Sequence, residues 1–524
     1  MGSVVFKRTM NLGTGAAEND GDFLKSCFLE TPEFETLLDF EDKKTILLGR
    51  TGSGKTALIK MWPELKDIIH IEIRPDTFAL QYISNIPFIR SMKNAGLNLD
   101  IFYKFLWLHE IISNVIKQYF WYNKERDFFQ DIGEKLGFGG RVSQLKKYLE
   151  TYEDVFFKDE SISKITNGIE NKLGKELGFE SFIKIAEDLT ESQKQEIQTK
   201  TSQQINSDHI KQLKNIITIF REYFSKNKEQ KIVITIDKLD ENWMDEQSKY
   251  GLVSALLDAT RMFIDVPNLK IVIAMRSDLL NKTVSTMNRQ AEKDTAFTLK
   301  INWKLPMLEK LLDKRINFLL EHKYARHVKL TFRELFDCDI SGVKGYDYIL
   351  QRTMMRPRDA IEFVNFCLIE ADDESIITPV HIIRAEETYR GKRLEALMHE
   401  WEYVYPNIDI YLKSIRDTGN SFKYQAALSR YDDIEKTLLS LGKGREDDPI
   451  ISAFLSCNDE YCRSDNIKKL LNTLFIVGIL GKETIYGDIL YSTPDSPELG
   501  FLDYDDYVFR LHPLFKKMET SKES

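Results

Sequence analysis

The chain has 524 residues, of which 42% are hydrophobic and 30% charged, a composition typical of a globular protein with about two to four domains. Its 82 acidic and 73 basic residues give a net charge of −9, so any contact with DNA must use a local basic patch. The sequence contains no apolar run of membrane-spanning length and no signal-peptide pattern, and its five cysteines lack the spacing of zinc sites. We therefore expect a reduced, cytoplasmic protein with no membrane contact.

Four short apolar runs predict the strands of a buried sheet, and they lie at residues 44–48, 68–73, 231–236 and 269–275. Because these runs are apolar throughout and alternate with helical segments, they predict a parallel sheet with helices on both faces. The first run leads directly into a glycine-rich loop, and the helix after that loop ends before Pro63.

Helical spacing of apolar residues dominates the rest of the chain. It extends over residues 97–224, which is far longer than one crossover connection needs, and over residues 305–400. Towards the C-terminus the pattern becomes mixed. The elements predicted there are helices at 425–441 and 465–475 and strands at 484–492 and 507–511.

The glycine-rich loop has the pattern of a phosphate-binding P-loop. It consists of Gly49, Arg50, Thr51, Gly52, Ser53, Gly54, Lys55 and Thr56, with Ala57 at the start of the following helix. The glycines let successive N–H groups point inward at phosphates, and the helix adds its positive dipole end. Lys55 reaches the β- and γ-phosphates, and the Thr56 hydroxyl coordinates Mg²⁺. The pattern predicts binding of ATP and Mg²⁺; the alternative is a glycine-rich turn without a ligand.

An acidic residue on a neighbouring strand completes such a site by holding the water shell of the metal. Asp237 ends the third predicted strand and is assigned this role, with an ordinary strand-end aspartate as the alternative. Asp240, ahead of Glu241, is the candidate base that orients the attacking water. Lys238 occupies a position where a second acid is common. It either weakens hydrolysis or points into solvent.

Three arginines are candidates for contact with the γ-phosphate. Arg276 ends the fourth predicted strand, where a cation would lie beside that phosphate; the alternative is an ion pair with Asp278. Arg356 and Arg358 open a helix whose first turn suits Pro357. These two either swing onto the phosphates from a lid domain or form a solvated helix cap.

We therefore predict an α/β fold, with a P-loop NTPase core built on a parallel sheet, a large helical insertion, a helical lid and a C-terminal winged-helix-like domain. The insertion is interpreted either as a helical subdomain packed on the core or as a surface for a partner protein or oligomer contacts. The predicted boundaries are 1–43 for a segment flanking the nucleotide site, 44–95 and 228–304 for the core, 96–227 for the insertion, 305–415 for the lid and 416–524 for the winged-helix-like domain.

The loop and the segments IVITIDKLDENW, IVIAMRSD and MMRPRDAIEF together resemble the AAA+/STAND superclass of ATPases. Within it, the chain is similar to prokaryotic P-loop ATPases that have a helical insertion, a lid like that of origin-recognition ATPases and a C-terminal winged helix. The resemblance covers most of the chain outside roughly residues 125–210. It implies a sensor-one role for Arg276 and a sensor-two role for Arg356 or Arg358, and it places residues 15–20 near the adenine. It also implies a setting in antiviral defence or mobile-element loci, while Lys238 departs from the family pattern and puts fast turnover in doubt.

Residues 467–481 and the strands after them resemble a winged helix, which contacts either DNA or protein. Contact with DNA would use Lys468, Lys469 or the wing, whose segment 503–506 is acidic. A further basic set, either lining a DNA channel or solvated, consists of Arg384, Arg390, Lys392, Arg393, Lys413, Arg416 and Lys423.

The function predicted first is an ATP-driven conformational switch in an antiviral defence system. Binding of Mg-ATP between core and lid, followed by hydrolysis, would signal to a partner effector, since the chain has no nuclease or protease motif of its own. A homo-oligomer is compatible with this prediction. The alternatives are a DNA-binding ATPase that loads or remodels a nucleic-acid complex and a scaffold that binds ATP but hardly hydrolyses it.

Overall fold

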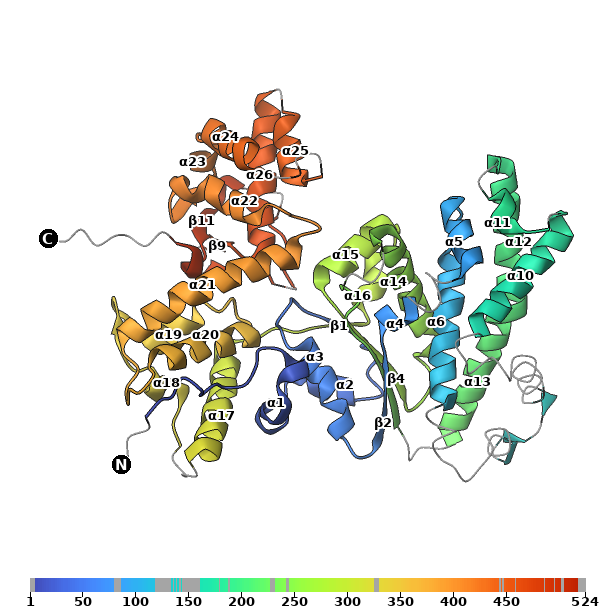
Figure 1. The fold of residues 1–524 in the computed structure, drawn as a ribbon, viewed down its shortest axis with the longest axis horizontal. Helices are drawn as coiled ribbons and strands as arrows, with labels where there is room; N and C mark the ends of the chain where they lie inside the picture. The colour runs from blue at the N-terminus through green and yellow to red at the C-terminus, as the bar shows by residue number, and fades with distance from the viewer. Residues whose placement is uncertain are drawn as a thin grey trace. The chain divides into compact units, whose positions relative to one another are not determined.

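The computed structural model describes residues 5–79, 86–117, 133–134, 136–137, 139–140, 143, 161–178, 180–186, 189–226, 231–241, 245–324, 329–442, 444, 447–457, 459–484, 486–493, 495–500 and 504–516. The chain divides into two compact units (Figure 1). The core unit comprises Glu30–Gly49 and Lys55–Lys300, and the C-terminal unit comprises Met1–Leu29, Arg50–Gly54 and Ile301–Ser524. The middle of the glycine-rich loop thus belongs to one unit and both of its flanks to the other.

A five-stranded parallel sheet is the centre of the core unit. Its strands are β1 (Ile46–Leu48), β2 (Ile68–Ile73), β3 (Lys231–Ile236), β4 (Leu269–Met275) and β5 (Thr298–Lys300), in the order β2-β3-β4-β1-β5. The three inner strands are buried along almost their whole length, whereas the edge strands β2 and β5 are partly exposed. The α/β class and the parallel sheet predicted from the apolar runs are confirmed.

The strand order places a topological switch point at β1. Its neighbours are β4 and β5, while β2, the next strand along the chain, lies at the far edge of the sheet. Leu48 of β1 pairs with Met275 of β4, and Ile236 of β3 pairs with Ile273, so the residues that follow these strands emerge at one edge. In open α/β sheets, ligands bind outside the carboxyl ends of strands at such a switch point.

The helices of the core unit share one hydrophobic cluster with the sheet. α6 is buried on nearly all sides, as expected for a helix enclosed by others, and its Trp107 donates to the carbonyl of Leu252 on α14. A π-helix (Ile205–Ile210) joins α12 to α13. The helices are α2 (Pro32–Leu38), α3 (Lys55–Lys60), α4 (Pro75–Ala79), α5 (Pro87–Asn94), α6 (Asp100–Val115), α10 (Ser161–Leu177), α11 (Phe182–Ile185), α12 (Glu191–Gln204), α13 (Lys211–Lys226), α14 (Glu246–Thr260), α15 (Ser277–Thr286) and α16 (Ala291–Thr295).

The C-terminal unit combines a helical part with a four-stranded antiparallel sheet around a second hydrophobic cluster. Its helices are α1 (Gly21–Cys27), α17 (Leu305–Tyr324), α18 (Phe332–Leu335), α19 (Gly345–Leu350), α20 (Pro357–Glu370), α21 (Pro379–Trp401), α22 (Ile408–Ile415), α23 (Tyr424–Leu428), α24 (Tyr431–Leu441), α25 (Pro449–Leu455) and α26 (Glu460–Val477). The sheet has the order β10-β9-β11-β8, from β8 (Ser421–Lys423), β9 (Leu480–Glu483), β10 (Ile489–Leu490) and β11 (Val508–Leu511).

Several elements differ from the sequence prediction. A hairpin of β6 (Asp339–Ile340) and β7 (Val343–Lys344) interrupts the segment predicted as helical throughout. β5 and β8 were not predicted, because each contains a single apolar residue and therefore no apolar run. Parts of the predicted insertion (118–132 and 144–160), the end of the IVITIDKLDENW segment (242–243) and wing residue 503 lie outside the described residues. In the described part of the chain, no helix has the length and apolar character that a membrane span requires.

Two buried histidines make the stability of the core unit sensitive to acid. Burial lowers the pKa of His109 on α6 to about 3 and that of His209 on the π-helix to about 4. Both stay neutral in the folded protein while an unfolded chain binds protons below pH 6.5, so stability is lost as the pH falls from about 6.5 towards 4. We expect a loss of about 2–3 kcal/mol for each histidine by pH 4.5, measured as lower protection of the α6 amides relative to their intrinsic exchange rate at each pH.

The variants His109→Gln and His209→Gln should each flatten this pH dependence. His399→Gln is the matched control, because the His399 side chain is 73% exposed. If all three variants keep the slope of the unaltered protein, acid sensitivity has another source.

Candidate nucleotide-binding site

The glycine-rich loop joins the end of β1 to the start of α3. Gly52 and Gly54 have φ angles of +78° and +97°, in the left-handed region that glycine enters without strain. A Cβ atom on Gly52 would lie 3.1 Å from the Cβ atom of Arg358, a tight contact that also favours glycine there. These two positions let the backbone turn tightly before the helix begins at Lys55.

Within the C-terminal unit, three successive carbonyls of the loop each accept a hydrogen bond. They are Thr51 O from Arg356 Nη1 at 3.0 Å, Gly52 O from Arg358 N at 3.5 Å and Ser53 O from Trp303 Nε1 at 2.8 Å. We refer to these as the carbonyl contacts. They satisfy three backbone acceptors of the loop with donors from the protein.

The N–H groups of the same loop fit an anion. Among the residues that the structure describes, the amides of Thr51, Gly52 and Gly54 donate to no protein acceptor, and the buried Ser53 hydroxyl has no hydrogen-bond partner. Unsatisfied donors are costly when water is excluded, and a loop at a helix start commonly satisfies them with a phosphate. The loop is therefore chemically suited to a phosphate group.

Within the core unit, the first two side chains of α3 are engaged at the end of the sheet. Lys55 Nζ donates to the carbonyl of Gly49 at 3.0 Å, and the Thr56 hydroxyl donates to Asp237 Oδ2 at 2.8 Å. Burial raises the pKa of Asp237, while the Thr56 hydrogen bond and a bond from the Lys238 amide oppose that rise. The structure therefore brings together the two predicted metal-site residues.

This pair is an incomplete metal site by itself. Mg²⁺ is commonly held by one or two protein oxygens together with phosphate oxygens and water, rather than by a cage of side chains. Across the described ranges, no cluster of three or more His, Cys, Asp or Glu residues could hold a metal ion. The hydroxyl of Thr56 and the carboxylate of Asp237 therefore fit Mg²⁺ only together with a phosphate ligand.

The two candidate bases have different neighbours. The Glu241 side chain is 56% exposed, and its carboxylate lies 3.4 Å from Lys238 Nζ. Asp240 is 32% exposed and lies 4.0 Å from Arg276 Nε at the end of β4. Asp240 is therefore the less exposed of the two side chains and lies next to Arg276, at the carboxyl end of β4. Glu241 is an exposed partner of Lys238.

Arg276 forms the ion pair with Asp278 that the sequence left open as an alternative. Its Nε and Nη2 atoms donate to the two carboxylate oxygens at 2.8 and 2.9 Å, and its side chain is only 10% exposed. With Asp240 on its other side, the guanidinium lies between two carboxylates. A contact of Arg276 with a γ-phosphate remains a prediction.

Arg356 belongs to a buried cluster of four charged residues, which we call the ion cluster. Its pairs are Arg356–Glu400 at 3.0 Å, Arg393–Glu400 at 3.4 Å and Arg393–Asp359 at 3.4 Å. All four side chains are almost fully buried, and burial raises the pKa of Asp359. Arg356 therefore points into the protein and reaches the carbonyl of Thr51, instead of forming a solvated cap at the start of α20.

Arg358 connects the loop to the N-terminal segment. Its Nε atom donates to the carbonyl of Gly15 at 3.0 Å, while its backbone amide donates to Gly52. The segment is held further along by a buried ion pair between Asp20 and Arg315. Of residues 15–20, which were predicted to lie near the adenine, Gly15 is thus linked to the loop through Arg358.

Sequence reasoning did not assign a role at the nucleotide site to Trp303, Asp359, Arg393 or Glu400. Trp303 stands in a short segment after β5 with no motif around it. Arg393 and Glu400 lie seven residues apart on α21, a spacing that puts both on one face of a helix. That spacing was the available signal for part of the ion cluster.

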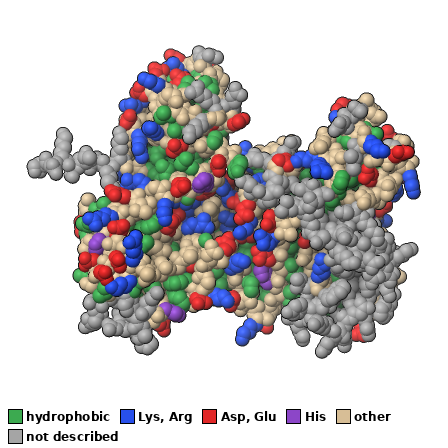
Figure 2. Space-filling model, in the orientation of Figure 1, with side chains coloured by type: hydrophobic (Ala, Val, Ile, Leu, Met, Phe, Trp, Pro, Cys, Tyr) green, Lys and Arg blue, Asp and Glu red, His purple; other side chains and the backbone are tan. Residues whose placement is uncertain are grey.

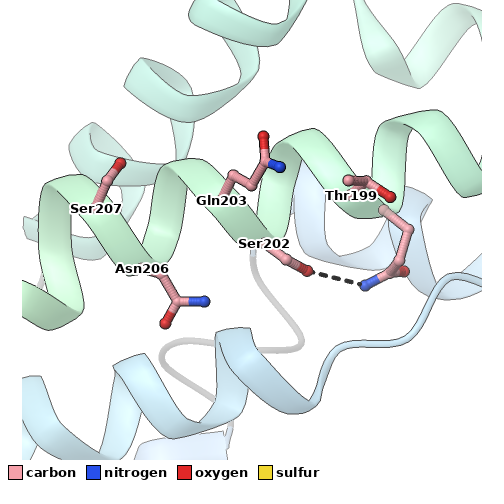
Figure 3. A pocket seen from close by; sticks show the side chains of 6 residues that line it. Thr199, Ser202, Gln203, Asn206 and Ser207 are labelled. Atoms are coloured by element: carbon pink, nitrogen blue, oxygen red, sulfur yellow. Dashed lines mark hydrogen bonds between the residues drawn. The ribbon is translucent and has the colours of Figure 1, made fainter.

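A shallow groove on α12 and the π-helix has a different chemistry. Figure 3 shows its lining of uncharged side chains, and Gln198 donates to Ser202 at 3.5 Å. The lining residues are Gln198, Thr199, Ser202, Gln203, Asn206 and Ser207. Without a charged group, this groove has no means to bind phosphate strongly.

The sequence comparisons concern the C-terminal unit and the chain as a whole. Residues 306–398 match the model of the FunZ-associated C-terminal helical domain. This range begins in α17, contains α18, α19 and α20, and ends in α21. The chain is also a distant homologue of the "Putative transposon gamma-delta 80.3 kDa protein" of Escherichia coli strain K12, at 24% identity over 519 residues. The alignment covers 96% of this chain and 66% of the relative, so this chain spans about two thirds of the length of the relative.

The carbonyl contact from Trp303 is testable by one substitution. Trp303→Phe keeps an aromatic ring and removes the donor to Ser53 O. With Mg-ATP as the probe of phosphate binding at the loop, we expect the affinity measured by calorimetry to fall about three- to tenfold, because one hydrogen bond contributes about 0.5–1.5 kcal/mol. Trp107→Phe removes an indole hydrogen bond to Leu252 in the core unit and is the matched control. If both variants lose the same affinity for Mg-ATP, the cause is general destabilisation and not the loss of the hydrogen bond to Ser53.

Proposed function

We propose that this chain is an ATPase that binds Mg-ATP at the loop of residues 49–56 and uses the bound nucleotide as a conformational switch. The observation that carries the proposal is the loop itself. The carbonyls of Thr51, Gly52 and Ser53 are held by the carbonyl contacts, and the amides of Thr51, Gly52 and Gly54 have no protein acceptor among the described residues. Thr56, at the end of the loop, is paired with Asp237. This combination supports binding of a phosphate chain with a divalent cation.

In this proposal each residue has a defined task. Bound Mg-ATP would supply the transferable phosphoryl group and a charge that polarises it. The loop amides and Lys55 hold phosphate oxygens, with Lys55 leaving the carbonyl of Gly49 to do so. Thr56 and Asp237 hold the metal, and Asp240 orients the attacking water. Lys238 is compatible with slow turnover, which suits a switch better than a motor.

The setting of the switch is also a proposal. The relative named above carries the word transposon in its name, which favours a mobile-element setting over the antiviral defence system predicted first. Similarity of fold does not carry function, so the relative does not identify a partner. We infer a partner effector from the sequence, which contains no nuclease or protease motif. The C-terminal unit, which contains both the loop centre and α26, is the part through which a switch would act.

DNA binding by the C-terminal unit is the second candidate function, and the described contacts weaken it. Lys468 lies over the rings of Tyr424 and Tyr504, and Lys469 pairs with Asp465 at 2.7 Å. In the further basic set, Arg390 pairs with Glu386, Arg393 lies in the ion cluster and Lys392 lies over Phe366. On the face shown in Figure 2, basic and acidic side chains are intermingled. These cations have partners within the protein that phosphates of DNA would have to replace.

Two substitutions separate binding from hydrolysis. Lys55→Ala should reduce both ATP affinity and turnover, since it removes the cation of the loop. Asp240→Asn should retain binding and lower turnover by at least about 100-fold, the usual contribution of a positioned base. Glu241→Gln is the matched control and should keep most of the activity. If Lys55→Ala turns over ATP normally, the proposal fails; if Glu241→Gln abolishes turnover instead, the base is Glu241.

Turnover with and without double-stranded DNA distinguishes the candidate functions. We expect ATP hydrolysis that DNA does not change, with Lys55→Ala as the blank. Stimulation by DNA, weakening with salt, would favour the remodelling ATPase. Tight ATP binding with no turnover in either condition would favour the non-hydrolysing scaffold.

A further inference from the structure

The C-terminal end of α26 contacts Arg50, a residue of the glycine-rich loop. The guanidinium of Arg50 donates to the carbonyl of Ile476 in the last turn of α26, and both residues belong to the C-terminal unit (helix labelled in Figure 1). Ile476 carries one of the four terminal carbonyls that an α-helix cannot satisfy by itself. Arg50 also places a positive charge at the negative end of an 18-residue helix dipole.

Gly478 makes room for this contact. It caps α26 with a φ angle of +87°, and a Cβ atom there would lie 3.0 Å from Arg50 Nη1 and 3.4 Å from Met354 Cε. The left-handed cap therefore favours glycine, and a side chain there would also displace the arginine slightly. Two independent features of the sequence, Arg50 in the loop and Gly478 after α26, meet at one point.

The helix end leads directly into the C-terminal sheet. Ile479 donates to the carbonyl of Leu474, and its own carbonyl accepts from the amide of His512 after β11. β9 starts at the next residue, Leu480, and pairs with β10 and β11. A change at the Arg50 contact would therefore reach the four-stranded sheet through one residue.

We propose that Arg50 is a positioning residue that couples occupancy of the loop by nucleotide to the C-terminal turn of α26; the inference rests on the ATP binding proposed above. A phosphate held by the loop amides fixes the backbone that carries Arg50, and the guanidinium then stays on Ile476. Without phosphate the loop fluctuates and the helix end frays more often. By linkage, loss of the Arg50 contact weakens ATP binding by the factor by which ATP stabilises the helix end.

The test is hydrogen exchange of the full chain with and without saturating Mg-ATP, with ATP occupancy measured by calorimetry. In the unaltered protein, ATP should slow exchange of the Gly478 and Ile479 amides by about five- to tenfold. In Arg50→Met, which keeps the aliphatic stem and loses the donors, this slowing should fall below about twofold. The affinity of this variant for ATP should drop by about five- to tenfold, the factor by which ATP slows exchange in the unaltered protein. Lys469→Met is the matched control on the same helix and should respond like the unaltered protein.

Arg50→Lys keeps the charge and should restore part of the response, which a merely structural role for the arginine stem would not predict. Full slowing in Arg50→Met at equal ATP occupancy would overturn the coupling while leaving ATP binding intact. The same conclusion follows if ATP binds to the unaltered protein and exchange at the helix end does not change. Failure of the unaltered protein to bind ATP would overturn both the function and the coupling.

Discussion

A peptide loop whose N–H groups turn towards a ligand turns carbonyl groups away from it, and these carbonyls need partners of their own in protein or water. In this chain the carbonyls of three consecutive loop residues are held by the C-terminal unit, through Trp303, Arg356 and Arg358. The loop conformation therefore depends on folding of helices far along the chain. The part that matches the FunZ-associated helical domain contains both arginines, while Trp303 precedes it by three residues.

The ion cluster explains why Arg356 can perform this task. An arginine at a helix start normally lies in water, where its guanidinium samples many directions. Here Glu400 holds Arg356, and Arg393 links Glu400 to Asp359, so two cations and two anions are buried together. Such clusters add little net stability because of the desolvation penalty, but removing one partner typically costs about 3–5 kcal/mol. We interpret the cluster as a device that fixes one side-chain direction, the one that reaches Thr51.

The sequence was informative wherever a signal is local. Apolar runs predicted β2, β3 and β4 with their observed ends, and the pattern from Gly49 to Thr56 predicted the loop and its place between a strand and a helix. Thr56 and Asp237 were both assigned to one metal site, and the structure brings their side chains within hydrogen-bonding distance; the metal itself stays a prediction. The carbonyl contacts could not be predicted in this way. They join residues that are 250 or more positions apart, and neither a lone tryptophan nor an arginine beside a proline specifies such a partner.

Lys238 bears on the choice between the two candidate bases. It adopts a φ angle of +63°, which is strained for a lysine and costs of the order of 1 kcal/mol. In this conformation its amide donates to Asp237, and its side chain reaches Glu241. The lysine charge is thus matched by Glu241, and a base role for Glu241 would require that pair to break. A base role for Asp240 would not require the Lys238–Glu241 pair to break, because Asp240 lies beside Arg276. Asp240 is also near enough to Asp237 for its charge to help raise the pKa of the Asp237 carboxyl. The strained residue therefore separates the two acids, placing Asp240 at the sheet edge and keeping Glu241 at the surface.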